Sequence, residues 1–346
     1  MIRRRGIIVF LLLVILMTAC PYYGYKYNTG VLPTSPVNLE DFNTQYDDYN
    51  LSAPTINHLF TLFFSTNRNS DGENFDIIHE DFEIEFDKDN ADLTAGKIIN
   101  NWWGLHDPSV LNQILDTINT PYNELGPVVS YLNEEMDSYH YNENDQYLVL
   151  WASDQSGDLD IMLTHTDTDD DTTLLFIEPA EILYLNSGSD DAYPSIDFDN
   201  KIIYFCSDRG LDFDIYSCEL PAQREVLYSL ENQTLDADIL KCAVLSSPSN
   251  DKCPSISNNV LVFTSDRPGG QGGYDLWYSV REGSGWSEPE NFGKQINTEY
   301  DEYRPILKHL NDFQHDLLMF SSNRPGGKGG FDLYFVGVKK LIESDY

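Results

Sequence analysis

The sequence predicts an all-β fold, a β-propeller with five recognisable four-stranded blades, and three observations carry this prediction. One hairpin phrase recurs five times along the 346 residues. Its copies are separated by intervals long enough for four strands. The start of the chain also contains a strand-like phrase that the last repeat lacks, which predicts a ring closed by the N-terminal strand.

The hairpin phrase is clearest at Leu261–Tyr278, which reads LVFTSDRPGGQGGYDLWY. An apolar run of β-formers ends in Ser-Asp-Arg, a glycine-rich turn reverses the chain, and a second strand follows from Asp275. The other copies are Leu62–Ile77, Leu148–Ile161, Ile202–Tyr216 and Leu318–Tyr334. Five copies of one hairpin indicate a repeat architecture.

The spacing of the repeats is typical of propeller blades. The third-strand aspartates lie 84, 54, 61 and 57 residues apart; they are Asp76, Asp160, Asp214, Asp275 and Asp332. We expect the first strand of each blade to open at a proline, namely Pro54, Pro127, Pro194, Pro254 and Pro305. The longest interval leaves Glu83–Ile99 unassigned and so leaves room for a sixth blade.

The two ends of the chain predict how the ring closes. The last hairpin runs out at Phe335–Val338 without a fourth strand, whereas Pro36–Tyr49 resembles the phrase that forms the fourth strand elsewhere. A fourth strand supplied by the N-terminal segment would cover a sheet edge that could otherwise pair with other chains. We therefore expect residues 36–346 to form a single propeller domain.

The N-terminus is typical of an exported lipoprotein. Residues 1–19 combine three arginines with an apolar run and form a predicted signal peptide. Met17-Thr18-Ala19-Cys20 resembles a bacterial lipobox, which implies a lipid on Cys20 and a tether over residues 20–35. Pro21 favours the outer membrane, with the protein facing the periplasm. The alternative is an ordinary signal peptide with an incidental cysteine.

Composition narrows the possible partners. The chain has 21 Lys and Arg against 57 Asp and Glu, a formal net charge of −36. Such a polyanion repels phosphates, so we expect no nucleic acid partner. The charge either keeps the protein soluble or forms a surface for cations or a basic partner. Cys206, Cys218, Cys242 and Cys253 allow three disulfide pairings, or they are buried thiols.

The repeated polar residues are expected to be structural. Each third-strand aspartate can cap the backbone of the tight turn beside it, or pair with the arginine of the same hairpin. These arginines are Arg68, Arg209, Arg267 and Arg324. Because the second repeat keeps Asp160 but has Gln155 in place of arginine, we favour turn capping.

The hairpin phrase resembles the TolB-type, WD-like β-propeller repeat. The motif is Ser-Asp-Arg or Ser-Asn-Arg followed by Gly-Gly-x-Gly-Gly-aromatic-Asp-Leu-aromatic, and the resemblance covers about residues 36–338. It is closest to the version found in lipoproteins and in OmpA-associated propeller proteins of the outer membrane. The resemblance implies a lipid-anchored propeller that binds a protein or an envelope polymer.

Motifs for catalysis are lacking. The chain has no Gly-x-Ser-x-Gly elbow and no His-Glu-x-x-His, and we predict no catalytic residue, cofactor or metal. Asp167, Asp169, Asp171 and Glu178 match a calcium loop in part, but Thr172 stands where that loop needs glycine. We therefore expect a non-catalytic binding scaffold. The alternative is a five-bladed glycan hydrolase, whose two or three carboxylates would ring the central funnel.

Four tyrosines mark a candidate binding rim. Tyr46, Tyr122, Tyr300 and Tyr303 lie beside acids in the phrases that connect one blade to the next. Aromatic faces beside carboxylates suit sugars or a basic peptide. The alternative is that these tyrosines pack between blades, as repeated aromatics commonly do.

Overall fold

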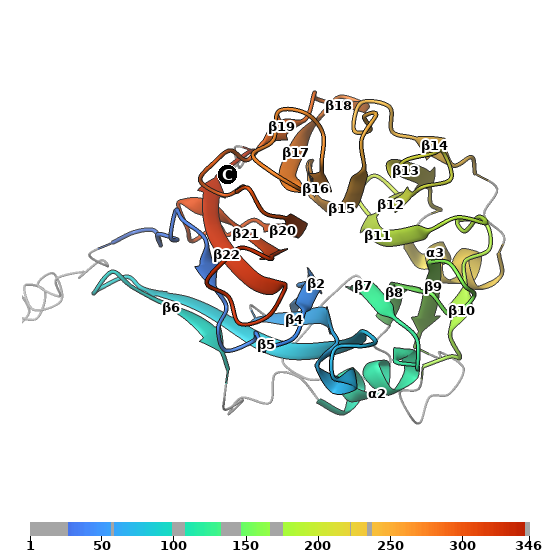
Figure 1. Cartoon of the computed structure of the whole chain (residues 1–346), viewed down its shortest axis with the longest axis horizontal. Coiled ribbons are helices and arrows are strands. Elements are labelled where there is room, and N and C mark those ends of the chain that lie inside the picture. Colours follow the sequence, from blue (N-terminus) through green and yellow to red (C-terminus); the bar gives the residue numbers. More distant parts are fainter. Residues whose placement is uncertain are drawn as a thin grey trace, which may run out of the picture.

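The computed structural model is a ring of five antiparallel blades around a central axis (Figure 1), as predicted. It describes residues 27–56, 59–98, 108–132, 147–166, 176–221, 223–233 and 237–342. The signal peptide, Cys20 and most of the tether lie outside these residues, as do Asp167, Asp169 and Asp171 of the partial calcium loop. No helix in the described part of the chain is long and apolar enough to cross a membrane.

Each blade runs from an inner strand at the axis to an outer strand at the rim. Blade 1 contains β2 (Asp48–Ser52), β4 (Leu59–Thr66), β5 (Asp76–Asp87) and β6 (Asp92–Lys97), with β3 (Thr55–Ile56) paired to β4. Blade 2 contains β7 (Glu124–Tyr131), β8 (Tyr147–Ser153), β9 (Asp160–His165) and β10 (Ala180–Glu181). Blade 3 contains β11 (Asp191–Asp197), β12 (Ile202–Ser207), β13 (Asp214–Glu219) and β14 (Leu240–Lys241).

The remaining blades follow the same order. Blade 4 contains β15 (Asp251–Ser257), β16 (Val260–Ser265) and β17 (Asp275–Glu282), whose outer neighbours are β18 (Gly285–Trp286) and β19 (Glu290–Asn291). Blade 5 contains β20 (Glu302–Lys308), β21 (His315–Ser322), β22 (Asp332–Lys339) and β1 (Val37–Asn38). The 3-10 helix η1 (Arg68–Ser70) and helices α2 (Pro108–Ile118) and α3 (Gln223–Glu231) lie between strands.

The inner strands begin before the predicted prolines. Pro127, Pro194, Pro254 and Pro305 lie inside their strands, and Pro54 follows β2. All five inner strands have a register shift near their third residue, where the backbone takes φ values from 50° to 59°. The five residues are Asn50, Gly126, Tyr193, Cys253 and Arg304. This β-bulge therefore recurs at the same point of each blade, next to the axis.

The core lies between adjacent blades. Every residue of β8 and β16 is buried, because each second strand is covered on both faces by neighbouring blades. The described cysteines are free thiols, so none of the three pairings is formed among them. Cys206, Cys218 and Cys253 are buried and Cys242 is half-buried.

The N-terminal strand closes the ring as predicted, through a shorter segment than expected. Only Val37 and Asn38 pair with β22, opposite Phe335 and Tyr334. Asn43 reinforces this contact, since its side chain accepts from the amide of Leu333 (2.8 Å) and donates to its carbonyl (3.0 Å).

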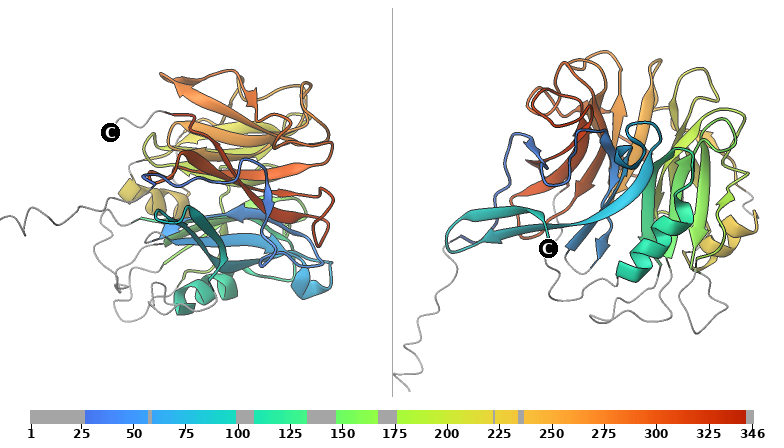
Figure 2. Two further views of the ribbon diagram at one scale, coloured as in Figure 1. Left: turned by 90° about the vertical axis from the view of Figure 1, so that its left-hand side faces the viewer. Right: turned by 60° about the horizontal axis from the view of Figure 1, so that its bottom comes forward.

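Residues 83–98 do not add a sixth blade. They form most of the β5–β6 hairpin, which projects outward from the ring (Figure 2). The described residues therefore contain five blades, and the hairpin accounts for most of the segment left unassigned by the sequence.

Candidate functional site

Blades 1, 3, 4 and 5 each have an arginine just after the second strand, and this arginine ties the first two strands of its own blade together. In blade 4, Arg267 donates from Nε to Ser265 Oγ (3.0 Å) and from Nη2 to Asp251 Oδ1 (2.6 Å). Its guanidinium also lies 4.9 Å from the centre of the Phe263 ring. The equivalent ion pairs are Arg68–Asp48, Arg209–Asp191 and Arg324–Glu302. The predicted structural arginines therefore pair with the first-strand acid and not with the third-strand aspartate.

The third-strand aspartates cap turns in the last two blades. Asp275 Oδ2 accepts from the amide of Gln271 (2.6 Å), and Asp332 accepts from the amides of Lys328 and Gly329. In the other blades the partners are side chains: Asn69 for Asp76, Ser156 for Asp160 and Lys241 for Asp214. Turn capping, the favoured interpretation, thus describes blades 4 and 5.

Blade 2 lacks the arginine and leaves an acid without a counter-ion. Glu124 is fully buried and accepts hydrogen bonds from Thr120 Oγ1 (2.5 Å) and Ser153 Oγ (3.4 Å). Its Oε2 atom has no hydrogen-bond partner among the described residues. Burial raises the pKa of Glu124 to about 7.

The hairpin turns and the blade connections meet on one face of the ring, which we call the turn face. A side chain at Gly272 would collide with the backbone of Glu299, and one at Gly329 with the backbone of Tyr46. Each glycine-rich turn thus lies directly against the connection that enters the next blade. Only glycine permits so close an approach of two backbones.

Five loop pairs surround the axis on the turn face. We define a loop pair as the residue just before the inner strand and the residue just after the second strand. The pairs are Asp47–Asn67, Asn123–Asp154, Asp190–Asp208, Asn250–Asp266 and Asp301–Asn323. In each, the backbone amide of the first residue donates to the side chain of the second, at 2.8 to 3.0 Å.

Blade 3 is the exception among the loop pairs. The other four combine one carboxylate with one amide, and in blades 2, 4 and 5 the amide Nδ2 donates to the carboxylate at 2.6 to 3.0 Å. In blade 3 both members are carboxylates, Asp190 and Asp208. No side-chain amide is available there to donate to a carboxylate, so blade 3 has two acids where the other blades have one acid and one amide.

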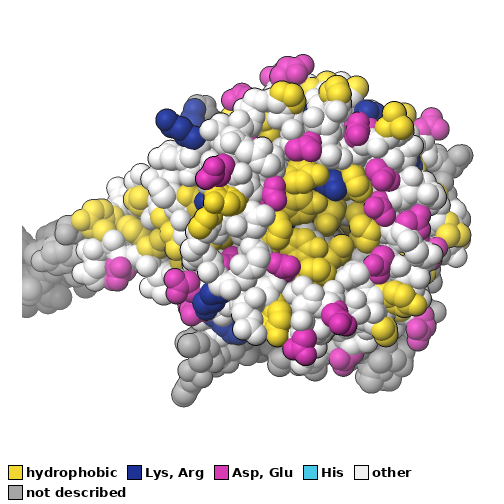
Figure 3. All heavy atoms as spheres, in the orientation of Figure 1, with side chains coloured by type: hydrophobic (Ala, Val, Ile, Leu, Met, Phe, Trp, Pro, Cys, Tyr) yellow, Lys and Arg dark blue, Asp and Glu magenta, His cyan; other side chains and the backbone are white. Residues whose placement is uncertain are grey.

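An apolar patch fills the centre of the turn face (Figure 3), with acidic side chains around it. We call it the axial patch: Tyr49, Phe75, Leu159, Phe213, Tyr274, Tyr303 and Phe331, all partly exposed. Aromatic contacts link its members, such as Tyr49–Phe75 (4.8 Å between ring centres) and Tyr274–Tyr303 (5.5 Å). Asp190 adjoins it directly, since its Oδ1 accepts from the amide of Leu159 (2.9 Å).

Two cations occupy the axis. Lys252 is half-buried, and its Nζ lies 3.7 Å from the centre of the Phe213 ring. Arg304 is only 2% exposed and extends from blade 5 to blade 2, where Nη2 lies 3.4 Å from the carbonyl of Gly126. Neither residue forms an ion pair with a described acid.

The predicted rim tyrosines do not form one surface. Tyr122 and Tyr300 are 44% and 37% exposed, whereas Tyr46 is partly buried and donates to Asp71 (3.1 Å). Tyr303 belongs to the axial patch instead. Ligand binding by the other three tyrosines stays a prediction.

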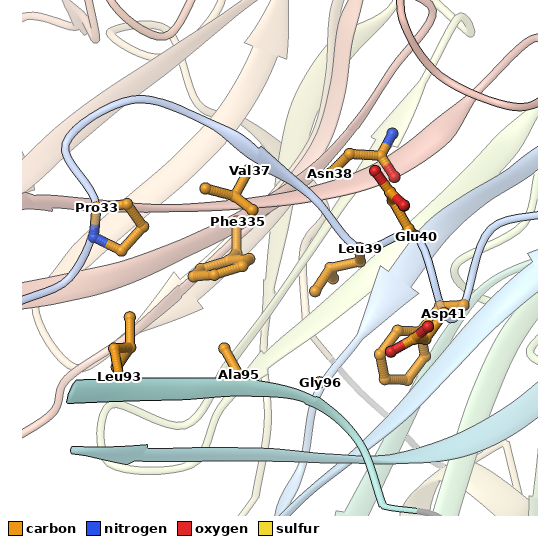
Figure 4. Close-up of a pocket in the computed structure, with 11 residues that line it drawn as sticks. Pro33, Val37, Asn38, Leu39, Glu40, Asp41, Leu93, Ala95, Gly96 and Phe335 are labelled. Carbon is orange, nitrogen blue, oxygen red and sulfur yellow. The ribbon is translucent and has the colours of Figure 1, made fainter. Parts of the chain in front are cut away.

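A concavity of about 500 Å³ lies at the seam where the ring closes (Figure 4). Val37, Leu39, Phe335 and Leu93 form its apolar walls, and Glu40 and Asp41 lie at one end. It is the space between β1, β22 and the β5–β6 hairpin, away from the axis. The described residues contain no cluster of three or more His, Cys, Asp or Glu placed to hold a metal ion.

Sequence reasoning missed the residues that make the axis distinctive, namely Asp190, Asp208, Lys252 and Arg304. A signal for the first two was present. Aligning the residue before each inner strand with the residue after each second strand shows one acid and one amide in four repeats, and two acids in the third. The positions of the two cations depend on the bulge and could not be seen in that way.

Comparison with known proteins identifies the architecture. No protein-family model and no curated protein matches the chain. Among solved structures, 133 chains match. A thermostable family-43 glycoside hydrolase has a TM-score of 0.51 at 12% identity, covering 89% of this chain and 94% of that one. The exo-β-1,3-galactanase 1,3Gal43A from Clostridium thermocellum has a TM-score of 0.50 at 13% identity, covering 89% of this chain and 63% of that one.

These likenesses establish the five-bladed propeller fold and correct the family resemblance. The resemblance to TolB-type lipoproteins is wrong, because the matching structures are five-bladed glycoside hydrolases. The physical reason is that the hairpin phrase serves needs common to propeller blades: the arginine ties strands together, and the glycines let the turn touch the next connection.

The same finding overturns the interpretation as a non-catalytic binding scaffold and the expectation that the protein is not an enzyme. Lipidation of Cys20 and an outer-membrane location stay predictions from the sequence.

Proposed function

We propose that the protein is a glycoside hydrolase that binds its glycan at the axial patch. The observation that carries the proposal is the break in the loop-pair pattern at Asp190 and Asp208. Residues that recur in every repeat of a ring usually have a structural role. A site that binds a single substrate is expected where one repeat differs from the others. That place adjoins the aromatic surface at the axis.

The chemistry of hydrolysis fits two acids beside aromatic rings. One carboxylic acid must protonate the departing glycosidic oxygen, and one carboxylate must activate water or attack the sugar carbon. We assign these tasks to Asp190 and Asp208 as a pair. Aromatic faces of the axial patch would stack on the apolar faces of sugar rings.

The fold supports the proposal without naming the substrate. The two structural neighbours above are glycoside hydrolases, one of them a β-1,3-galactanase by its title. A first panel of substrates therefore contains β-1,3-galactan, arabinan, arabinoxylan and glycans rich in uronic acid. Release of reducing ends is the readout.

The structure offers matched variants for the test. Asp190→Asn converts blade 3 to the arrangement of Asn123–Asp154, and Asp208→Asn converts it to that of Asp301–Asn323. Both variants should fold at least as stably as the parent, because each restores the acid–amide pair of the other blades and removes one of two neighbouring like charges. Each should lower the hydrolysis rate by about 100-fold or more, the usual effect of losing a general acid or base.

Asp212→Asn is the control, since Asp212 is an exposed acid of a hairpin turn in the same blade. It should leave the rate unchanged. Full activity in both Asp190→Asn and Asp208→Asn would contradict the assignment, and no hydrolysis of any glycan by the parent protein would contradict the function itself.

A further inference from the structure

The axis carries positive charge without a counter-ion in a chain that is otherwise strongly acidic. Acids outnumber bases by 57 to 21, yet Lys252 and Arg304 form no ion pair with a described acid. Five other arginines, by contrast, do form one: Arg68, Arg209, Arg267, Arg281 and Arg324. Arg304 therefore differs from these five arginines, each of which has an acid partner.

Arg304 is the more unusual of the two. Its Nε and Nη1 atoms are buried and have no hydrogen-bond partner among the described residues. The guanidinium lies 5.4 Å from the centre of the Tyr193 ring, and Tyr193 in turn contacts Tyr303 of the axial patch (6.2 Å). An unsatisfied buried charge costs several kcal/mol. Residues that retain such a cost in the free protein commonly contact a ligand.

Lys252 brings the second charge to the surface of the patch. Its ammonium group lies over Phe213 and 5.8 Å from the centre of the Tyr274 ring, so aromatic faces surround it. Lys252 and Arg304 lie on β15 and β20, the adjacent inner strands of blades 4 and 5. An anion held by Lys252 at the axis would also lie within the field of Arg304.

We propose that the axial patch binds a sugar unit that carries a carboxylate, a uronic acid, with Lys252 and Arg304 supplying the positive charge. This inference rests on the proposed function and specifies its substrate class. The aromatic rings bind the faces of the sugar, and the carboxylate pairs with Lys252 within the field of the buried Arg304. A neutral sugar would leave Lys252 and Arg304 without a counter-ion.

The acidic surround sharpens this selectivity. A net charge of −36 repels anions at long range, so an acidic polymer gains affinity only where its carboxylate reaches the two axial cations. Tight binding of an acidic polymer therefore indicates recognition at the axis and not general attraction of an anion to the protein. Binding should be measured near 0.15 M salt, where the long-range field is screened within about 8 Å.

The test compares trigalacturonic acid with its methyl ester by calorimetry. The two ligands share a backbone, and the ester replaces each carboxylate with an uncharged, slightly larger methyl ester. All titrations use the Asp190→Asn background, so that no ligand is consumed. The free acid should bind about 10- to 100-fold more tightly than the ester, the range expected for a charge-assisted hydrogen bond.

Variants assign the selectivity to the axis. Lys252→Gln should weaken binding of the free acid by about 10-fold and leave the ester unaffected. Lys294→Gln, which removes an exposed lysine, should change neither ligand. Arg304→Met should also lose the preference for the acid while raising the melting temperature of the free protein, because it removes an unpaired buried charge.

Two outcomes would overturn the inference: equal affinity for acid and ester, or equal losses in Lys252→Gln and Lys294→Gln. These results are independent of the hydrolysis assay. Binding of the acid without hydrolysis by the parent would contradict the proposed function alone, whereas hydrolysis of neutral glycans with no preference for the acid would contradict this inference alone.

Discussion

The replacement of the repeat's arginine by Gln155 leaves Glu124 with a strongly raised pKa. At Gln155 the chain lacks the arginine that neutralises the first-strand acid in the other four blades. Glu124 is fully buried and its pKa is raised to about 7 by desolvation. The pKa values of Asp160 and Glu302 are raised as well, chiefly by desolvation.

Glu124 should make stability depend on pH. Because its pKa is higher in the folded protein than the ordinary value of 4.5, the stabilising contribution is complete below pH 4.5 and is lost as the pH rises through about 7. Glu124→Gln keeps the shape and removes the charge. At pH 8 this variant should be more stable than the parent by about 3 kcal/mol, and at pH 4.5 the two should be alike.

Denaturant unfolding across this pH range measures the effect, and Glu219→Gln at an exposed position is the control. The difference between Glu124→Gln and the parent isolates this group from Asp160 and Glu302. A difference that does not change with pH would show that Glu124 has an ordinary pKa in the folded protein.

At the scale of the blade, the arginine holds three elements with one side chain. Arg267 joins the end of β16, the start of β15 through Asp251, and the connection into the blade through the carbonyl of Leu245. Asp251 in turn accepts from the amide (2.5 Å) and the hydroxyl (2.9 Å) of Ser247. The network fixes how each blade enters the ring.

Arg267→Gln should reproduce in blade 4 the situation of blade 2. It leaves the fully buried Asp251 without its counter-ion, so we expect a loss of about 3 kcal/mol at pH 7, the usual cost of breaking a buried pair. Thermal and denaturant unfolding measure it, with Lys294→Gln as the control; a loss below about 0.5 kcal/mol would mean that the ion pair adds little to stability.

At the scale of the whole molecule, the ring depends on a segment from the opposite end of the chain. Leu39 and Phe42 are 3% and 2% exposed, and they pack with Leu333 and Phe335 of β22. The side chain of Asn43 adds two hydrogen bonds to Leu333. Closure is thus a packing contact as well as a short strand.

A truncation that begins at Gln45 should open the ring while leaving β2 intact. It removes β1 and the two apolar side chains, which together contribute about 5 kcal/mol. It also uncovers the outer edge of β22, so the protein should associate as well as melt earlier. Light scattering after gel filtration and thermal melting measure these effects. A truncation that begins at Val31 retains β1 and should stay monomeric, and a monomeric, fully stable Gln45 truncation would show that closure does not need the segment.

Much of the fold could be predicted from the sequence, because its cues are local. Alternation of apolar runs with glycine-rich turns is imposed by the hairpin itself, and the spacing of the third-strand aspartates reflects the length of four strands. The missing fourth strand of the last repeat predicted the closure by β1 for the same reason. The short pairing of Val37 and Asn38 could not be predicted, because Asn43 and the buried Leu39 and Phe42 hold the segment by contacts that have no periodicity.

The candidate site depended on the tertiary structure. Which of the many acids face one another is decided by the loops that place Asp190 beside Asp208. The charge at the axis is decided by the bulge that sends Arg304 across to Gly126. The sequence alone determined the propeller and its repeated turns and ion pairs, since those recur from blade to blade. The features that distinguish the site arise where one blade departs from the others. Only the closed ring brings those departures together.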